Sequence, residues 1–420
     1  MKSSNDALAN KLSKLFFSFQ QFCRRRWLVF PLVAGFLLAS LVLPAFSLAP
    51  PAEIRGVWLT NIDSKVMFEP KQLTGAIAAL SKLNFNTIYP TVWNWGYTLY
   101  PSSVAQKVTG YPLDPAPELQ RRDPLDEIAQ QGKKLGMTVI PWFEFGFMAP
   151  ADSELAKRHP EWLVQRRDGT TIWLESNIHQ RVWLNPLHPE VQQFITDLIL
   201  EIINRDGVGG IQLDDHFGYP SEFGYDPLTE KLYRQEHGGH PPPANHQERE
   251  WIQWRADKIT AYMQQLRRAI REKQPSALVS LSPNPQQFSL EAFLLDWFRW
   301  QQLGLIDELV VQLYRDNHKD FLRELAQPEL QATKNRIPVG VGILSGVKGK
   351  LVPIKRIQQQ VQATRDRGFA GVSFFFYESL WQMSPESPQE RQKALKSVFP
   401  KPEKRPAGQS NGMMGNHVRA

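Results

Sequence analysis

The chain has 420 residues, of which 42% are hydrophobic and 22% charged, a composition typical of a globular protein with a sizeable core. Its net charge of +7 is concentrated in residues 1–52 and 399–420, so the stretch between them is near neutral and lacks the basic surface of a nucleic-acid-binding protein. The single cysteine, Cys23, precedes an apolar segment. A form that starts after that segment therefore has no disulfide, no thiol nucleophile and no cysteine-ligated metal.

The N-terminus carries the pattern of an export signal or a membrane anchor. A triple arginine at residues 24–26 precedes an apolar run over residues 27–43, and positive charge in that position holds the N-terminus in the cytoplasm. Small residues between Ala45 and Ala49 fit a cleavage site, whereas the length of the run also suits an uncleaved anchor. Both alternatives place the body of the protein outside the cytoplasm, in the periplasm or cell envelope.

From residue 54 onward, short apolar runs alternate with helical patterns. Eight runs are rich in Val, Ile, Leu and Phe without strict alternation, which is typical of parallel strands buried on both faces. The predicted strands are Ile54–Thr60, Asn86–Val92, Thr138–Phe143, Gly209–Asp214, Leu278–Pro283, Leu309–Tyr314, Pro338–Ile343 and Gly371–Tyr377.

Helical patterns separate these strands, and Gly136, Gly207 and Gly368 follow helix ends as C-cap glycines do. The clearest predicted helices are Pro70–Leu83, Pro124–Leu135, Pro189–Asn204, Trp251–Lys273 and Leu351–Arg367. Eight alternations predict an α/β fold, a single (β/α)₈ TIM barrel over residues 53–398, which we expect to be a monomer. Residues 399–420 are rich in Pro, Gly and charge and predict a disordered tail.

Long loops are expected on one face of this barrel. Three long segments, 93–122, 144–185 and 215–247, leave the carboxyl ends of the second, third and fourth strands. Barrel enzymes build their active sites from the loops on this face, so we look for the functional residues there.

Two adjacent carboxylates, Asp214 and Asp215, end the fourth strand. Burying a charged side chain costs free energy of folding, so a pair of acids at the end of an apolar strand suggests that the two side chains serve the function of the protein. Successive strand residues point to opposite sides, which places Asp214 inside the barrel and Asp215 on its rim. We predict that the pair is catalytic; the alternative for one of them is a helix cap or a loop salt bridge.

Two glutamates at other strand ends are further catalytic candidates, because glycoside hydrolysis uses one carboxyl as acid and another as nucleophile, base or charge stabiliser. Glu144 directly follows the third strand and Glu378 follows the eighth. For each, the alternative is a structural ion pair with an arginine at the barrel rim, such as Arg315 or Arg55.

The sixth strand places Gln312 and Tyr314 on one face, and we expect both to point inward. A tyrosine hydroxyl there fits a substrate amide or an oxyanion. Together with the acids of the fourth strand, this permits a catalytic role for Tyr314 in which the acetamide of an N-acetylated sugar acts as the nucleophile. Packing inside the barrel remains the alternative.

Aromatic and amide side chains near the same face predict a carbohydrate cleft, because tryptophan rings stack on sugar rings and amides bind hydroxyls. Each tryptophan taken alone is also a candidate core residue, and each asparagine a loop cap. The predicted substrate-binding residues are Trp93, Asn94, Trp95, Trp142, Asn185, His216, Gln312 and Trp381, with Trp183 as a further candidate platform.

We expect no metal and no cofactor. Asp214, Asp215 and His216 are consecutive, and three consecutive residues rarely converge on one ion. The chain carries no dinucleotide fingerprint, no phosphate-binding glycine loop and no Gly-x-Ser-x-Gly elbow in a strand–turn–helix context. The partner that these residues imply is a polysaccharide.

The sequence resembles the glycosyl hydrolase-like 10 family. The resemblance covers roughly residues 53–395 and rests on a set of blocks in the right order: Glu53–Thr60, Phe85–Tyr89, Tyr100-Pro101-Ser102, Asp123-Pro124-Leu125, Trp183-Leu184-Asn185-Pro186 and Asp214-Asp215. It implies a barrel glycosidase-like enzyme of the bacterial envelope, and some members are implicated in cutting peptidoglycan strands stripped of their stem peptides.

Two blocks depart from the family pattern. Where the family often has Asp-Asp-Tyr-Phe-Tyr-Pro, this chain reads Asp-Asp-His-Phe-Gly-Tyr-Pro over residues 214–220. Where the family often has Trp-Phe-Asn-Pro, this chain reads Trp-Phe-Glu-Phe over residues 142–145. The aspartate pair is kept, whereas Glu144 stands where the family often has an asparagine.

The sequence therefore predicts an envelope glycoside hydrolase that acts on an amino-sugar polysaccharide. Two other functions fit the same barrel: a non-catalytic carbohydrate-binding protein, and a metal-dependent deacetylase. Inverting, retaining and substrate-assisted mechanisms all stay open, because they depend on distances between carboxyl groups.

Overall fold

The computed structural model describes residues 52–407. The predicted signal or anchor, Cys23 and the chain after residue 407 lie outside the described residues. Among the helices of the described part, none is both long enough and apolar enough to cross a membrane.

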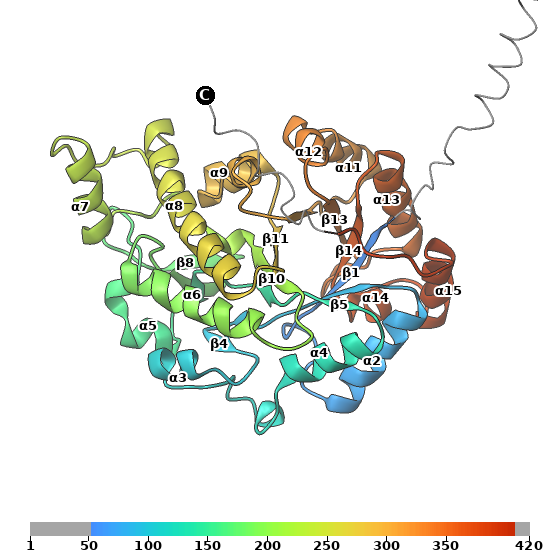
Figure 1. Ribbon diagram of the computed structural model, residues 1–420. Helices are drawn as coiled ribbons and strands as arrows, with labels where there is room; N and C mark the ends of the chain where they lie inside the picture. Colours follow the sequence, from blue (N-terminus) through green and yellow to red (C-terminus); the bar gives the residue numbers. More distant parts are fainter. Residues whose placement is uncertain (1–51, 408–420) are drawn as a thin grey trace, which may run out of the picture. The chain divides into compact units, whose positions relative to one another are not determined.

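A parallel sheet of nine strands forms the centre of the fold (Figure 1). Its strands are β1 (Ile54–Leu59), β2 (Thr87–Pro90), β5 (Thr138–Val139), β6 (Trp142–Phe143), β10 (Gly210–Asp214), β11 (Leu278–Ser282), β12 (Glu308–Gln312), β13 (Val339–Leu344) and β14 (Gly371–Phe375). Their order across the sheet is β5-β2-β1-β14-β13-β12-β11-β10-β6. All eight predicted strands are confirmed, with the third divided in two at Ile140 and Pro141.

The sheet curls, and its two end strands, β5 and β6, belong to one stretch of chain, residues 138–143. On one side of this stretch, the backbone N–H of Ile140 donates to the carbonyl of Ile88 at 2.9 Å. On the other side, the N–H of Gln212 in β10 donates to the carbonyl of Pro141 at 2.8 Å. The stretch therefore links the two ends of the strand order.

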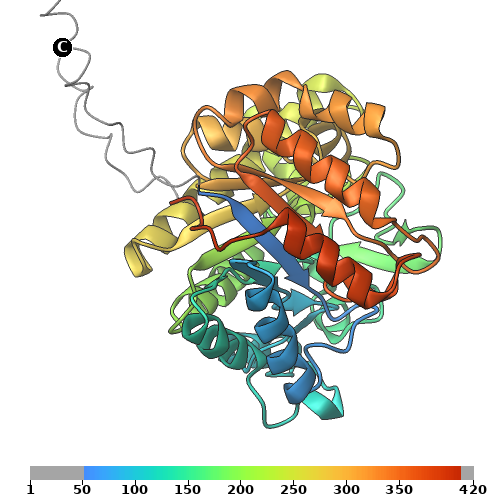
Figure 2. The same cartoon turned by 90° about the vertical axis from the view of Figure 1, so that its right-hand side faces the viewer.

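Helices cover the outer face of the sheet, as Figure 2 shows for the helices around β1. The principal helices are α2 (Pro70–Lys82), α4 (Pro124–Lys134), α6 (Pro189–Ile203), α8 (Arg249–Lys273), α9 (Gln286–Phe293), α10 (Trp297–Gln302), α11 (His318–Leu325), α12 (Pro328–Thr333), α13 (Ile354–Asp366) and α15 (Pro388–Val398). All five helices predicted from the apolar spacing are present within three residues of their expected bounds. The side chain of Asp123 caps α4 by accepting from the N–H of Asp126 at 3.1 Å.

The remaining elements lie in the segments between strands and helices. The hairpin β3 (Trp93–Asn94) and β4 (Tyr97–Thr98) follows β2, and a small antiparallel sheet in the order β7-β9-β8 follows β6. Its strands are β7 (Met148–Pro150), β8 (Trp173–Glu175) and β9 (His179–Trp183). The short helices are α3 (Ser103–Thr109), η1 (Pro117–Leu119), α5 (Glu154–Arg158), η2 (Pro160–Trp162), η3 (Asp215–Phe217), α7 (Pro227–Glu236) and α14 (Ser379–Gln382). The three long segments expected after β2, β6 and β10 are therefore structured additions.

Three separate sets of buried residues stabilise the described part of the fold, and the third lies around α7 and the start of α8: Leu187, Tyr225, Tyr233, Trp251 and Trp254. The largest set packs the helices against the sheet, and a smaller aromatic set comes from the strands: Trp58, Tyr89, Ile140, Trp142, Val310 and Phe376. Polar side chains run through this smaller cluster. Trp58 Nε1 donates to Gln212 Oε1 at 2.7 Å, and Gln212 Nε2 donates to the hydroxyl of Ser280 at 3.0 Å. The Ser280 hydroxyl in turn donates to Glu308 at 2.8 Å. Each donor in this buried chain of hydrogen bonds, from Trp58 to the carboxylate of Glu308, therefore has an acceptor.

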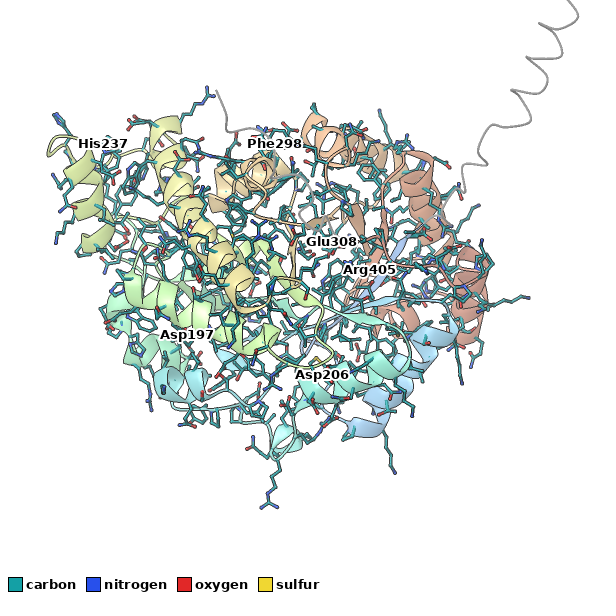
Figure 3. The ribbon with its side chains drawn as sticks, in the orientation of Figure 1. Asp197, Asp206, His237, Phe298, Glu308 and Arg405 are labelled. Carbon is teal, nitrogen blue, oxygen red and sulfur yellow. The ribbon has the colours of Figure 1, made fainter. Side chains whose placement is uncertain are left out.

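The segment after α15 packs against the amino ends of the strands. The N–H of Glu53 donates to the carbonyl of Lys404 at 2.9 Å, and Arg405 forms an ion pair with the buried carboxylate of Glu308. Figure 3 places the labelled Glu308 and Arg405 next to each other. The prediction of a disordered tail is therefore wrong for residues 399–407, because a buried carboxylate needs a cationic partner and this segment supplies it. Residues 408–420 lie outside the described part.

Candidate active site

Asp214 is buried at the carboxyl end of β10. Its Oδ1 accepts hydrogen bonds from the backbone N–H of Asp215 at 2.7 Å and from the side-chain amide of Gln312 at 2.8 Å. Burial, and after it the negative charge of Asp215, raises the pKa of Asp214 well above its usual range. The protonated form of Asp214 is therefore favoured over that of an aspartate in water.

Asp215 begins η3 and is the more exposed member of the pair, with 11% of its side chain accessible against 3% for Asp214. The side-chain amide of Asn284, just after β11, donates to Asp215 Oδ2 at 2.6 Å. The sequence placed the two acids on opposite sides of the strand end, and their different partners agree with that. Asn284 itself was missed, although a polar residue directly after a predicted strand was a usable signal.

Glu144 lies at the end of β6 beside the aspartate pair. Its Oε2 accepts hydrogen bonds from the Thr91 hydroxyl at 3.0 Å and from the Asn94 amide at 2.6 Å. Burial raises the pKa of Glu144 to about 8, although both hydrogen bonds favour the ionised form. The charge of Glu144 is also among the causes that raise the pKa of Asp214, so the two side chains are electrostatically linked.

Asn94 has two acceptors, because its amide nitrogen also donates to Asn61 Oδ1 at 3.0 Å. Its own carbonyl oxygen is buried and has no hydrogen-bond partner within residues 52–407. The sequence predicted Asn94 as a substrate-binding residue. The structure places it at the site, where it holds Glu144 in position, and the supporting residues Thr91 and Asn61 were missed.

His216 lies close to all three acids. Its Nδ1 is 2.9 Å from the backbone carbonyl of Glu144, 3.5 Å from Asp215 and 3.9 Å from Asp214. A carbonyl only accepts, so Nδ1 carries a proton and donates to it. One ligand atom from each of residues 214–216 lies within 4.8 Å of the others, the arrangement of a possible cation site. The hydrogen bond from Nδ1 to Glu144 leaves that nitrogen unavailable as a ligand.

Tyr314 faces the same acids from the chain just after β12. Its ring stacks on Phe375, with the ring centres 5.5 Å apart. Burial raises its pKa, and the charges of Asp214, Asp215 and Glu144 raise it further. Within the described residues the hydroxyl makes no hydrogen bond, and it is not counted among the buried unpaired atoms. It is therefore free to bind a group of a substrate.

Glu378 has other partners. Its carboxylate accepts from the hydroxyl of Ser64 and, at 3.2 Å, from the N–H of Val66, both in the segment after β1. Burial raises its pKa. In the part of the chain that the structure describes, no hydrogen bond or ion pair joins Glu378 to the aspartate pair. The alternative suggested by the sequence, an ion pair between Glu378 and an arginine at the barrel rim, is likewise absent among the described residues.

Several predicted substrate-binding residues are buried structural residues. Trp93 is fully buried and stacks on Phe143, and Trp142 belongs to the buried aromatic cluster of the strands, so neither offers a free face to a sugar. Trp381 is half-buried and packs on Tyr377 at 6.0 Å. The amide of Asn185 donates to Asp226 and Thr229, at 2.9 Å each. Trp183 is likewise fully buried. Their sequence positions near strand ends suggested the cleft, but a position along the chain does not show that neighbouring side chains cover a residue.

Trp95 differs from the other tryptophans because 40% of it is exposed. It occupies the tip of the β3–β4 hairpin with Gly96, and both residues have positive φ, as a two-residue turn requires. The guanidinium of Arg181, which pairs with Glu175 at 2.8 Å, lies 5.2 Å from the centre of its ring. The hairpin thus presents a supported aromatic face beside the site.

A groove of about 450 Å³ is lined in part by Asn284. Neither aspartate lines this groove, but Asn284 donates to Asp215 and so connects the groove wall to the aspartate pair. Its lining combines amides, two carboxylates, a guanidinium and an aromatic ring: Asn284, Pro285, Gln287, Phe288, Glu291, Arg315, Glu324 and Gln327.

Comparison with known proteins identifies the family. The family model of glycosyl hydrolase-like 10 matches residues 53–364. Glycosyl hydrolase DigH of Escherichia coli (strain K12) is 24% identical over 370 residues, covering 75% of this chain and 80% of DigH.

Solved structures share the fold. The PgaB (BpsB) glycoside hydrolase domain from Bordetella bronchiseptica has a TM-score of 0.56 and 16% identity, covering 80% of this chain and 100% of that one. Alpha-L-fucosidase isoenzyme 2 from Paenibacillus thiaminolyticus has a TM-score of 0.57 and 15% identity, covering 83% of this chain and 49% of that one. With its family model matched over most of its length, this chain belongs to the glycosyl hydrolase-like 10 family.

Proposed function

We propose that the protein is a glycoside hydrolase that cleaves a polysaccharide through the Asp214–Asp215 pair. The observation that carries this proposal is the contrast within the pair: Asp214 is the more deeply buried carboxyl, which favours its protonated form, while Asp215 is more exposed and is held by a residue that lines a groove. Glycoside hydrolysis needs one protonated and one ionised carboxyl. Two carboxylates in such close contact repel each other, so the pair favours one protonated and one ionised carboxyl.

In this mechanism Asp215 meets the glycosidic bond and gives the proton of the pair to the leaving oxygen as the bond from that oxygen to the anomeric carbon breaks, and Asp214 behind it supplies this proton. Gln312 holds Asp214 from one side and Asn284 holds Asp215 from the other, so neither carboxyl is free to rotate. Glu144 adds a third carboxyl, and its pKa of about 8 leaves it largely neutral at pH 7, so it places no further negative charge beside the pair. Preorganised groups of this kind lower the barrier because they need no rearrangement during the reaction.

The nucleophile in this proposal is the substrate's own acetamide. Oxygens of Asp214 and Asp215 lie within 4.8 Å of each other, which is closer than the roughly 6.5–9.5 Å between the carboxyls of inverting enzymes. The free hydroxyl of Tyr314 faces both acids and suits the carbonyl of an N-acetyl group. The acetamide oxygen bonds to the anomeric carbon as the leaving sugar departs. A water molecule then breaks this new bond and returns a proton to the aspartate pair, so the reaction retains the anomeric configuration and requires an N-acetylated sugar.

The substrate class in this proposal is an amino-sugar glycan such as peptidoglycan strands without stem peptides. The glycosyl hydrolase-like family and the exposed Trp95 support a polysaccharide. The arginines at residues 24–26 before an apolar run support export to the periplasm or envelope, where such strands occur. We also infer that the curled sheet is a complete (β/α)₈ barrel with β5 and β6 as its third strand, supported by the hydrogen bonds on both sides of residues 138–143.

The test is incubation of the purified full-length protein with peptide-free peptidoglycan strands, chitin oligomers and plant-type glucans, followed by mass analysis of the products. We expect new reducing ends from the N-acetylated glycans and none from the glucans. Binding of a glycan without release of any product would replace the hydrolase with a carbohydrate-binding function. Product release that a chelator abolishes would favour a metal-dependent hydrolase.

A further inference from the structure

The groove beside Asp215 has features that the aspartate pair does not need for its chemistry. It is lined by two segments of the chain, the one from the end of β11 into α9 and the one from the end of β12 through α11 to Gln327. Phe288 in α9 is 52% exposed and lines this groove, an unusual position for a phenylalanine. Its only ring contact among the described residues is with Phe293 at 5.8 Å, so much of the ring remains uncovered.

The groove matches a sugar ring in size. Its volume of about 450 Å³ lies within the roughly 300–1,000 Å³ of small-molecule sites. A pyranose ring has apolar C–H groups on its faces and hydroxyls around its edge. The exposed ring of Phe288 suits the face, because an aromatic side chain buries a large apolar area on contact.

The polar lining suits the ring hydroxyls. Sugar hydroxyls donate and accept, and the lining offers both: amides from Gln287 and Gln327, and carboxylates from Glu291 and Glu324. Arg315 supplies further donors; its Nε donates to Glu324 at 3.1 Å, which fixes the guanidinium at the groove wall. This ion pair fixes the guanidinium before a sugar binds. Binding therefore does not cost the conformational entropy of ordering the Arg315 side chain.

We propose that this groove is a binding subsite for one pyranose ring of the glycan, with Phe288 as its stacking face and Arg315 and the amides as partners of the ring hydroxyls. The proposal rests on the proposed function, because it places the neighbouring sugar of the same chain beside the bond that Asp215 meets. With this subsite the enzyme also binds a sugar of the substrate other than the one whose glycosidic bond is cleaved. Specificity then includes chain length, since a glycan too short to reach Phe288 loses this contact.

Binding of chitohexaose to the full-length protein, with Asp215→Asn to block turnover, tests the subsite without requiring catalysis. In that background, Phe288→Ala is expected to weaken the affinity about tenfold, the loss of one aromatic contact. Phe288→Trp is expected to keep the affinity within about twofold. The matched control is Leu303→Ala, which removes an apolar side chain of similar exposure, 43%, that does not line the groove.

A second experiment measures the steady-state kinetics of glycan cleavage in the protein with Asp215 intact. Phe288→Ala is expected to raise KM about tenfold with kcat nearly unchanged, because the contact lies away from the reacting bond. Equal affinity for chitohexaose in Phe288→Ala and Leu303→Ala would overturn the subsite, as would an absence of chitohexaose binding in the parent protein. Binding that depends on Phe288 in a protein that cleaves no glycan would leave the subsite standing and overturn the hydrolase instead.

Discussion

Asn284 donates a hydrogen bond of 2.6 Å from its side-chain amide to the carboxylate of Asp215, and the same residue lines the adjoining groove. One side chain therefore both orients the proposed catalytic carboxylate and borders the space that a glycan would occupy. Because charge-assisted hydrogen bonds are among the stronger ones, the orientation of Asp215 depends on it.

Removal of this hydrogen bond is predicted to impair the reaction more than the fold. Asn284→Ala frees the Asp215 carboxylate to rotate, and we expect kcat/KM to fall about 10- to 100-fold, the loss of one charge-assisted hydrogen bond of about 1.5–3 kcal/mol. Steady-state kinetics on the cleaved glycan measures the change, with the melting temperature as the control for folding. Unaltered kcat/KM would show that Asn284 does not position Asp215.

The raised pKa of Glu144 predicts a pH-dependent stability. Burial moves this pKa from 4.5 to about 8, so the folded protein holds a proton that the unfolded chain releases. The contribution to stability is complete below pH 4.5 and is lost as the pH rises through 8. Glu144→Gln does not titrate, and we expect a smaller fall in melting temperature between pH 5 and pH 8.5 than in the parent protein.

The control for this pH effect is Glu272→Gln on the exposed surface of α8, which should keep the slope of the parent protein. Melting curves at a series of pH values supply the measurement. A slope in Glu144→Gln that matches that of Glu272→Gln would contradict a buried, protonated Glu144.

The exposed ring of Trp95, next to Asn94 in the β3–β4 hairpin, predicts a second contact with the glycan. Trp95→Ala is expected to raise KM roughly three- to tenfold, since one aromatic contact contributes about 0.5–1.5 kcal/mol. Trp95→Phe keeps an aromatic face over Arg181 and should lose less. If Trp95→Ala and Trp95→Phe had the same KM as the parent protein, the ring would serve only to cover Arg181.

The ion pair between Arg405 and Glu308 predicts that the segment after α15 contributes to stability. Arg405→Ala leaves a buried carboxylate without its cation, and we expect the free energy of unfolding to fall by about 3–5 kcal/mol. Urea denaturation measures the change. The exposed pair of Arg323 and Asp320 offers the comparison, because Arg323→Ala should cost less than about 1 kcal/mol. Equal costs for the two variants would mean that Glu308 does not depend on Arg405.

The strands and the aspartate pair were predictable from the sequence because their signals are local. Apolar runs without alternation mark parallel strands, and two acids at the end of such a run stand out whatever surrounds them. The same argument found Glu144, Gln312 and Tyr314, since each follows or ends a predicted strand. Parallel strands bring their carboxyl ends together, so these residues meet although up to 170 positions separate Glu144 from Tyr314 along the chain.

The rest depended on packing between distant segments. The sequence around a tryptophan at a strand end does not show whether a loop will cover its ring. The buried Trp93 and the exposed Trp95 therefore could not be distinguished from the sequence. Glu378 resembles Glu144 in position, but its partners come from the segment after β1. The segment with Arg405 has the composition of a disordered tail, and only the buried charge of Glu308, some hundred residues earlier, gives it a place to bind.

Reducing-end release from peptide-free peptidoglycan strands, compared between the parent protein and Asp215→Asn, tests the central claim most directly. Our account predicts release by the parent protein and a loss of at least a thousandfold in Asp215→Asn, with binding of the strands retained. Release that persists in Asp215→Asn at a rate near that of the parent protein would contradict it.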